Sequence, residues 1–167
     1  MKIFFPVLIA VTLLAGCLKK DQTCGYTEYN LIAPPVQVQQ LNDSLTKYGI
    51  TATTLHPSGF YYKINTPGSG PSVANLCSNI TVMYKGKFFD GKGFDSTKAG
   101  QAVDFQLGEV IAGWQKAIPL VSKGGDIDMY IPPYLAYGTT PRNDNSGNVI
   151  IPASSYLVFK VHIIDIQ

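Results

Sequence analysis

The sequence predicts an α+β fold in which one antiparallel β-sheet, curved into a half-barrel, wraps around one short α-helix, with a helical extension before it. Three observations predict this fold. Several segments after residue 60 alternate apolar and polar residues with a period of two, one short segment around the only tryptophan has helical spacing, and another helical pattern lies near residue 40. At 167 residues and 46% hydrophobic, the chain suffices for one domain with a substantial core.

The first residues predict a signal peptide, residues 1–16, that is removed. Lys2 precedes an apolar stretch (3–15) with the length of a signal-peptide core, too short to span a bilayer comfortably. The stretch ends in "LAGC", which resembles the lipobox of bacterial lipoproteins, and Cys17 is the expected lipidation site. Several acyl chains on Cys17 would hold the protein at the membrane without spanning it. An ordinary signal peptide followed by an incidental cysteine is the alternative.

Residues 17–59 are then a lipidated N-terminal tether and helical extension. The expected location is the cell envelope, lipid-anchored at the outer membrane on its periplasmic or surface face. Cys24 and Cys77 remain after Cys17 is set aside, and in an oxidising compartment they predict either a disulfide or two unpaired thiols. A disulfide would leave at most about 25 Å of extended chain between the domain and the lipid.

The helix of this extension is predicted within residues 33–50. Prolines stand at its entry, Gly49 is a plausible terminator, and apolar residues recur at helical spacing. These residues are Val38, Leu41, Leu45 and Tyr48.

Four strands are predicted downstream, at residues 60–64, 79–88, 126–131 and 156–164. In each of the last three, alternate apolar residues form one inward face: Ile80, Val82 and Tyr84; Ile127, Met129 and Ile131; Leu157, Phe159, Val161 and Ile163. We expect the last two of these strands to be half-buried, in a sheet with one covered face.

The cover is the segment "EVIAGWQKAIP", residues 109–119. Trp114 shares one helical face with Ile111 and Ile118, and Pro119 cannot continue the helix, so the face is brief. The tryptophan is either ordinary core or the floor of a binding pocket.

Several functions are excluded by the sequence. A net charge of +2 without long runs of either sign leaves no footprint for nucleic acid. The spacings of P-loops, zinc proteases, redox C-x-x-C motifs and nucleophile elbows are absent, so no metal and no cofactor is expected. His56 and His162 have no evident partner and are predicted to be surface residues.

Four collinear blocks resemble the FKBP-type peptidyl-prolyl cis-trans isomerases. They are "VMYKGKFFDGKGFDST" (82–97), "FQLGEVIAGWQKAIPLVSKGG" (105–125), "YIPPYLAYG" (130–138) and "VIIPASSYLVFKVHII" (149–164). The resemblance covers about residues 60–167, which is therefore the predicted isomerase domain.

The resemblance implies a hydrophobic pocket with Trp114 as its floor. It assigns catalytic roles to Phe94, Asp95, Trp114 and Tyr137, and substrate binding to Tyr84, Val103, Val110, Ile111, Ile151 and Phe159. In such proteins the backbone N–H of the residue matching Ile111 also binds a ligand carbonyl. Two features depart from the family: Val103 stands where an aromatic wall residue is common, and the loop 139–149 is longer and more polar.

The implied function is isomerisation of X-Pro bonds in exported proteins, without covalent chemistry. Its partners are proline-containing polypeptides, with macrolide inhibitors as further ligands of the pocket. The alternatives are a noncatalytic proline-peptide binding module or holdase on the same scaffold, and a structural surface lipoprotein.

Overall fold

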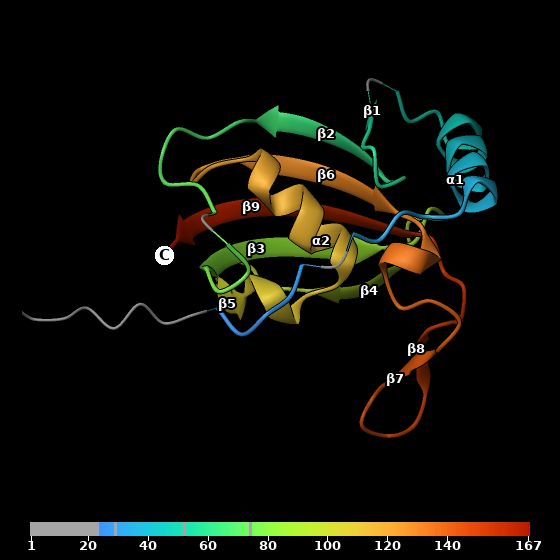
Figure 1. Ribbon diagram of the computed structural model, residues 1–167. Helices are drawn as coiled ribbons and strands as arrows, with labels where there is room; N and C mark the ends of the chain where they lie inside the picture. The colour runs from blue at the N-terminus through green and yellow to red at the C-terminus, as the bar shows by residue number, and fades with distance from the viewer. Residues whose placement is uncertain (1–23, 29, 52, 74) are drawn as a thin grey trace, which may run out of the picture.

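The computed structural model describes residues 24–28, 30–51, 53–73 and 75–167. The predicted signal peptide and Cys17 lie outside these residues. The main sheet follows the order β1-β2-β6-β9-β3-β4, with β5 also paired to β3, and all these pairings are antiparallel (Figure 1). Its strands are β1 (Thr54–Leu55), β2 (Tyr61–Thr66), β3 (Asn79–Lys87), β4 (Gly93–Ser96), β5 (Val103–Gln106), β6 (Asp126–Ile131) and β9 (Leu157–Ile166).

The sheet curves around helix α2 (Ala112–Ala117), which lies across one of its faces in Figure 1. Trp114 and Ile118 are buried, and a 3₁₀ turn that contains Pro119 ends the helical segment. Gly113 lets the helix approach the sheet closely, because a Cβ there would come within 2.7 Å of the Ile131 side chain. The predicted half-barrel around one short helix is confirmed.

The core beneath α2 consists largely of the strand residues that the sequence predicts to face inward. Ile80 and Val82 of β3, and the predicted inward residues of β6 and β9, are buried in one cluster with Trp114. A register shift between Thr81 and Val82 interrupts the pairing of β3 with β9, and irregularities of this kind increase local twist.

The opposite face of the sheet is partly covered by helix α1 (Pro35–Lys47). Leu41 and Leu45 pack with Tyr130 of β6 and Val158 of β9, and all four side chains are buried. The expectation that β6 and β9 are half-buried is therefore wrong where α1 lies. Tyr130 and Val158 alternate with the inward residues, so they need this second cover.

The two histidines also differ from the prediction. The ring of His56 stacks on Phe60 with a centroid separation of 4.4 Å, and His162 Nδ1 lies 2.9 Å from Asp126 Oδ1. Neither ring is a free surface group. His162 and Asp126 face each other across β9 and β6, whereas His56 and Phe60 lie four positions apart around a turn.

A small two-stranded sheet, β7 (Arg142–Asn143) and β8 (Val149–Ile151), projects from the main body (Figure 1). Asp144 Oδ1 accepts backbone N–H bonds from Ser146 and Asn148 and closes its turn. This hairpin contains most of the long polar loop noted in the sequence. Among the residues that the structure describes, no helix is long and apolar enough to cross a membrane.

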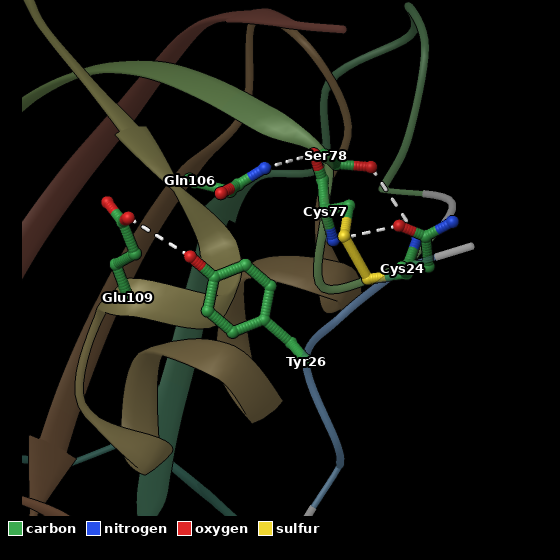
Figure 2. Close-up of a disulfide and its surroundings, with 7 residues drawn as sticks. Cys24, Tyr26, Cys77, Ser78, Gln106 and Glu109 are labelled. Carbon is green, nitrogen blue, oxygen red and sulfur yellow. Dashed lines mark hydrogen bonds between the residues drawn. A yellow bond between two sulfur atoms is a disulfide. The ribbon is translucent and has the colours of Figure 1, made fainter. Parts of the chain in front are cut away.

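The disulfide prediction is confirmed, because Cys24 and Cys77 are bonded across 53 positions of sequence. The bond fixes the first described residue beside the start of β3 (Figure 2). The alternative of two unpaired thiols is wrong.

Candidate active site

Aromatic rings surround Trp114 on several sides. Tyr84 of β3, Phe105 of β5 and Phe159 of β9 all meet the indole edge to face, with ring centroids 5.4, 6.1 and 5.3 Å from it. Each such pair stabilises its geometry by about 0.5–1.5 kcal/mol beyond simple burial. The indole is therefore held at a fixed angle, and only 4% of the residue is exposed.

Gly86 of β3 creates the space for the next two rings. A Cβ at this position would lie 2.7 Å from the Phe94 ring, which is too close for real atoms, and 3.0 Å from the Phe159 ring, which is tighter than most real contacts. Phe94 and Phe159 themselves pack edge to face with their centroids 5.5 Å apart. The glycine thus sets where both walls stand.

A cavity of about 580 Å³ opens beside these rings, within the size range of small-molecule sites. The residues that line it are Tyr84, Asp95, Phe105, Glu109, Val110, Ile111, Trp114, Ala136, Tyr137, Thr140, Arg142 and Phe159. An adjoining hollow of about 410 Å³ shares three of these residues, Asp95, Tyr137 and Arg142, and adds Phe94 and Ile151.

Seven of the ten residues that the sequence assigned to the site line the larger cavity, and two more, Phe94 and Ile151, line the hollow. Val103 lines neither and packs against the core instead. Phe105, two positions along the same strand, provides the aromatic wall. It has the same parity as Val103, and the period of two could have identified it.

Four further lining residues were missed: Glu109, Ala136, Thr140 and Arg142. Glu109 directly precedes the predicted pair Val110 and Ile111, so adjacency was a usable signal. Arg142 lies in the loop 139–149 that the sequence set apart, but which side chain of this loop reaches the cavity depends on how the β7–β8 hairpin folds back.

The polar side of the cavity is made by two tyrosines and one carboxylate. Tyr84 Oη donates a hydrogen bond of 2.6 Å to Asp95 Oδ2. Burial, and then this bond, raise the pKa of Tyr84 well above its ordinary value. Burial also raises the pKa of Tyr137, although Arg142, whose guanidinium lies 4.8 Å from the centre of the Tyr137 ring, opposes the shift. Both hydroxyls therefore keep their protons at neutral pH and can donate.

The backbone before α2 is held by one side chain. Gln115 Nε2 donates to the carbonyl oxygens of Gly108 and Val110, at 3.2 and 2.8 Å. Ile111 is the N-cap residue of α2, so its backbone N–H belongs to a helix terminus rather than to the helix ladder. Within the described chain the indole Nε1–H of Trp114 has no acceptor. The Tyr84 hydroxyl already donates to Asp95 and the indole N–H is buried, so the Tyr137 hydroxyl and the Ile111 N–H are the donors that the site can offer beside its apolar floor.

Comparison with known proteins identifies the same family as the sequence motifs, over most of the predicted isomerase domain. Residues 70–164 match the family model of the FKBP-type peptidyl-prolyl cis-trans isomerases. Among curated proteins, the FKBP-type peptidyl-prolyl cis-trans isomerase FkpA of Buchnera aphidicola (subsp. Schizaphis graminum) is 38% identical over 120 residues, 71% of this chain and 44% of that protein. The outer membrane protein MIP of Legionella longbeachae is 40% identical over 112 residues, 66% of this chain and 46% of that protein.

Two solved structures share the fold. FkpA from Escherichia coli superposes with a TM-score of 0.62 at 30% identity, covering 79% of this chain and 63% of that one. A peptidyl-prolyl cis-trans isomerase from Pseudomonas syringae pv. tomato gives 0.66 at 26% identity, covering 81% and 97%. The chain spans less than half the length of the two curated relatives named above. On its sequence, its fold and the residues of its cavity, the chain belongs to the FKBP-type peptidyl-prolyl cis-trans isomerase family.

Proposed function

We propose that this chain is an exported, lipid-anchored peptidyl-prolyl cis-trans isomerase that accelerates X-Pro rotation in polypeptides of the cell envelope. Residues 1–16 are the signal peptide, 17–59 the tether with its helix, and 60–167 the isomerase domain. The observation that carries the proposal is the cavity of about 580 Å³ beside Trp114, lined by aromatic rings and bordered by Asp95 and Tyr137.

The reaction needs no reactive side chain. Amide resonance sets a rotational barrier of about 18–20 kcal/mol, and no bond to carbon, nitrogen or oxygen is broken. The twisted imide has less charge separation than the planar form, so transfer from water to an apolar cavity costs the transition state less than the ground state. Fixed donors at the rim add electrostatic stabilisation without reorganisation.

The roles of the residues follow from their place. The proline ring rests on the Trp114 indole, and Tyr84, Phe94 and Phe159 enclose it, with Val110 and Ile151 at the sides. Tyr137 donates to a substrate carbonyl, Asp95 orients the Tyr84 hydroxyl beside the imide, and the Ile111 N–H binds a second carbonyl. Val103 supports the core behind Phe105.

Activity is expected to be nearly independent of pH between about 6 and 9. The raised pKa values of Tyr84 and Tyr137 keep both hydroxyls protonated throughout this range, and no step transfers a proton. A bell-shaped profile of kcat/KM with slopes near one would contradict the mechanism.

The decisive experiment is proline-limited refolding of a substrate protein in the presence of the mature chain. Wild type should accelerate the slow phase, while Asp95→Ala and Trp114→Ala should lose most of that acceleration. Tyr48→Ala, a change at an exposed residue after α1, is the matched control and should stay active. Wild-type protein that binds a proline peptide but leaves the slow phase unchanged would identify a binding module or holdase instead.

The anchoring and the inhibitor site have separate tests. Mass spectrometry of the mature N-terminus should find a lipid-modified Cys17, and an unmodified cysteine would remove the membrane from the proposal. The name of the Legionella longbeachae relative, outer membrane protein MIP, supports an envelope location. A macrolide that fills the cavity should quench Trp114 fluorescence and compete with proline peptides, and failure to compete would limit the site to peptides.

A further inference from the structure

The N-terminal segment lies against the backbone that leads into α2 (Figure 2). The disulfide attaches Cys24 to Cys77, and the Cys77 carbonyl accepts a bond of 3.2 Å from Gln106 Nε2 at the end of β5. The segment that follows Gln106 is the one that lines the cavity. The tether is therefore fixed beside the site by a covalent bond.

Tyr26 makes the closest contact of this segment. Its ring rests on Gly108, where an added Cβ would lie 2.2 Å from Tyr26 Cγ and 2.5 Å from both Cδ atoms. Its hydroxyl donates a hydrogen bond of 3.0 Å to Glu109 Oε1, and this bond is the main reason that the pKa of Tyr26 is raised (Figure 2). The ring and the hydroxyl of Tyr26 thus contact two consecutive residues, Gly108 and Glu109.

Of these two residues, Glu109 lines the cavity, and Gly108 directly precedes Glu109 in the chain. Glu109, Val110 and Ile111 all line the cavity, and Gln115 holds the same backbone from the α2 side through the carbonyls of Gly108 and Val110. Tyr26 supplies the second hold from outside the domain. It lies outside residues 70–164, the part that matches the family model, so this contact comes from the chain's own extension.

The charges around the cavity favour a cation. Its charged lining residues are Asp95, Glu109 and Arg142, and the Arg142 guanidinium is already placed over the Tyr137 ring. Asp95 accepts from Tyr84, and Glu109 accepts from Tyr26. A carboxylate that accepts one hydrogen bond from a neutral phenol keeps its full charge and its other lone pairs.

From this arrangement we infer that Tyr26 is a positioning residue for Glu109, and that the carboxylate so held selects substrates with a lysine or arginine next to the proline. The inference rests on the proposed function, because it concerns substrate choice at that site. Glu109 contacts the chain that flanks the proline, not the rotating imide. Loss of the Tyr26 hydroxyl alone, with the ring kept on Gly108, therefore changes affinity and selectivity and leaves kcat for an uncharged substrate unchanged.

The test uses three peptides that differ only in the residue before the proline, which is Lys, Ala or Glu. Affinity is read from Trp114 fluorescence, since this is the only tryptophan, and kcat/KM from the isomerisation rate. For the wild-type chain at low salt, the Lys peptide should bind about threefold more tightly than the Glu peptide, the size of an exposed ion pair. Equal affinities, or a preference for Glu, would overturn the inference.

Four variants then separate Tyr26 from Glu109. Glu109→Gln should abolish the Lys preference, and Tyr26→Phe, which keeps the ring on Gly108, should reduce it toward one. Gly108→Ala should match Tyr26→Ala, because the added methyl displaces the ring, and the two changes combined should cost no more than either alone. Tyr48→Phe is the control and should change nothing.

The outcomes are distinct. If Glu109→Gln removes the preference but Tyr26→Phe does not, Glu109 acts without Tyr26 and the positioning role is wrong. If the effects of Gly108→Ala and Tyr26→Ala simply add, the glycine acts through its own backbone and not through the ring, which also overturns the role. A wild-type chain that binds these peptides selectively but does not isomerise them would refute the proposed function alone.

Discussion

Replacement of Gly86 by alanine tests how the walls of the cavity are placed. The new methyl would stand 2.7 Å from two atoms of the Phe94 ring and 3.0 Å from the Phe159 ring, while ordinary contact begins at 3.4 Å. The Phe94 ring must therefore move by about 0.7 Å, and overpacking of this kind costs roughly 1–3 kcal/mol. Loss of the Phe94–Phe159 pair adds about 0.5–1.5 kcal/mol.

We expect Gly86→Ala to lower the free energy of unfolding by about 1.5–4.5 kcal/mol, measured by urea denaturation with Trp114 fluorescence. We also expect kcat/KM to fall by about tenfold or more, because displacement of a wall by a fraction of an ångström misplaces the imide. Gly93→Ala is the control in the paired strand β4, since the nearest atom to its Cβ is the Gly86 carbonyl oxygen at 3.8 Å. If both variants are equally stable and equally active, the close approach at Gly86 does not place the rings.

Three further predictions follow from the contacts. The double change Cys24→Ser and Cys77→Ser should lower the free energy of unfolding, measured in urea, by about 4 kcal/mol, because it opens a loop closed across 53 positions. An unchanged free energy of unfolding would contradict the loop-entropy account. Leu41→Ala should lower the free energy of unfolding by about 2–5 kcal/mol, because Leu41 is fully buried. It should leave kcat/KM unchanged, because α1 covers the sheet face opposite Trp114. Reduced activity would show that the two faces of the sheet are coupled. Above pH 10 the tyrosine at position 84 ionises in the unfolded chain before it does in the folded one, because folding raises its pKa, so the free energy of unfolding should decline as the pH rises. Tyr84→Phe should make this decline shallower. Identical slopes for the wild type and the variant would contradict the raised pKa.

The longer strands and the helix around Trp114 could be predicted from hydrophobic periodicity, because an element that is buried on one face repeats its apolar residues at a regular spacing. The predicted segments 79–88 and 126–131 correspond to β3 and β6, and the helix around Trp114 ends where Pro119 requires. The short strands β1, β4 and β5 are too brief for a pattern to emerge in two to four residues. They exist because they pair with longer strands.

Prediction of the site was limited by contacts between distant segments. The motif blocks identified the residues of β3, α2 and β9 that line the cavity. Val103 was assigned to the cavity wall in place of Phe105 because of its position in a motif, without knowledge of the packing. The bond from Tyr26 to Glu109 joins residues 83 positions apart, and nothing in either local sequence indicates it. The cover that α1 places on Tyr130 is hidden for the same reason.

The place of β9 in the sheet affects how the protein is made. This strand (Leu157–Ile166) lies between β6 and β3, and it alone joins the two halves of the main sheet while contributing Phe159 to the cavity. The two halves of the main sheet can therefore join only after β9 has been synthesised. A chain that ended before β9 would leave the facing edges of β3 and β6 unpaired, and unpaired strand edges favour association with other chains.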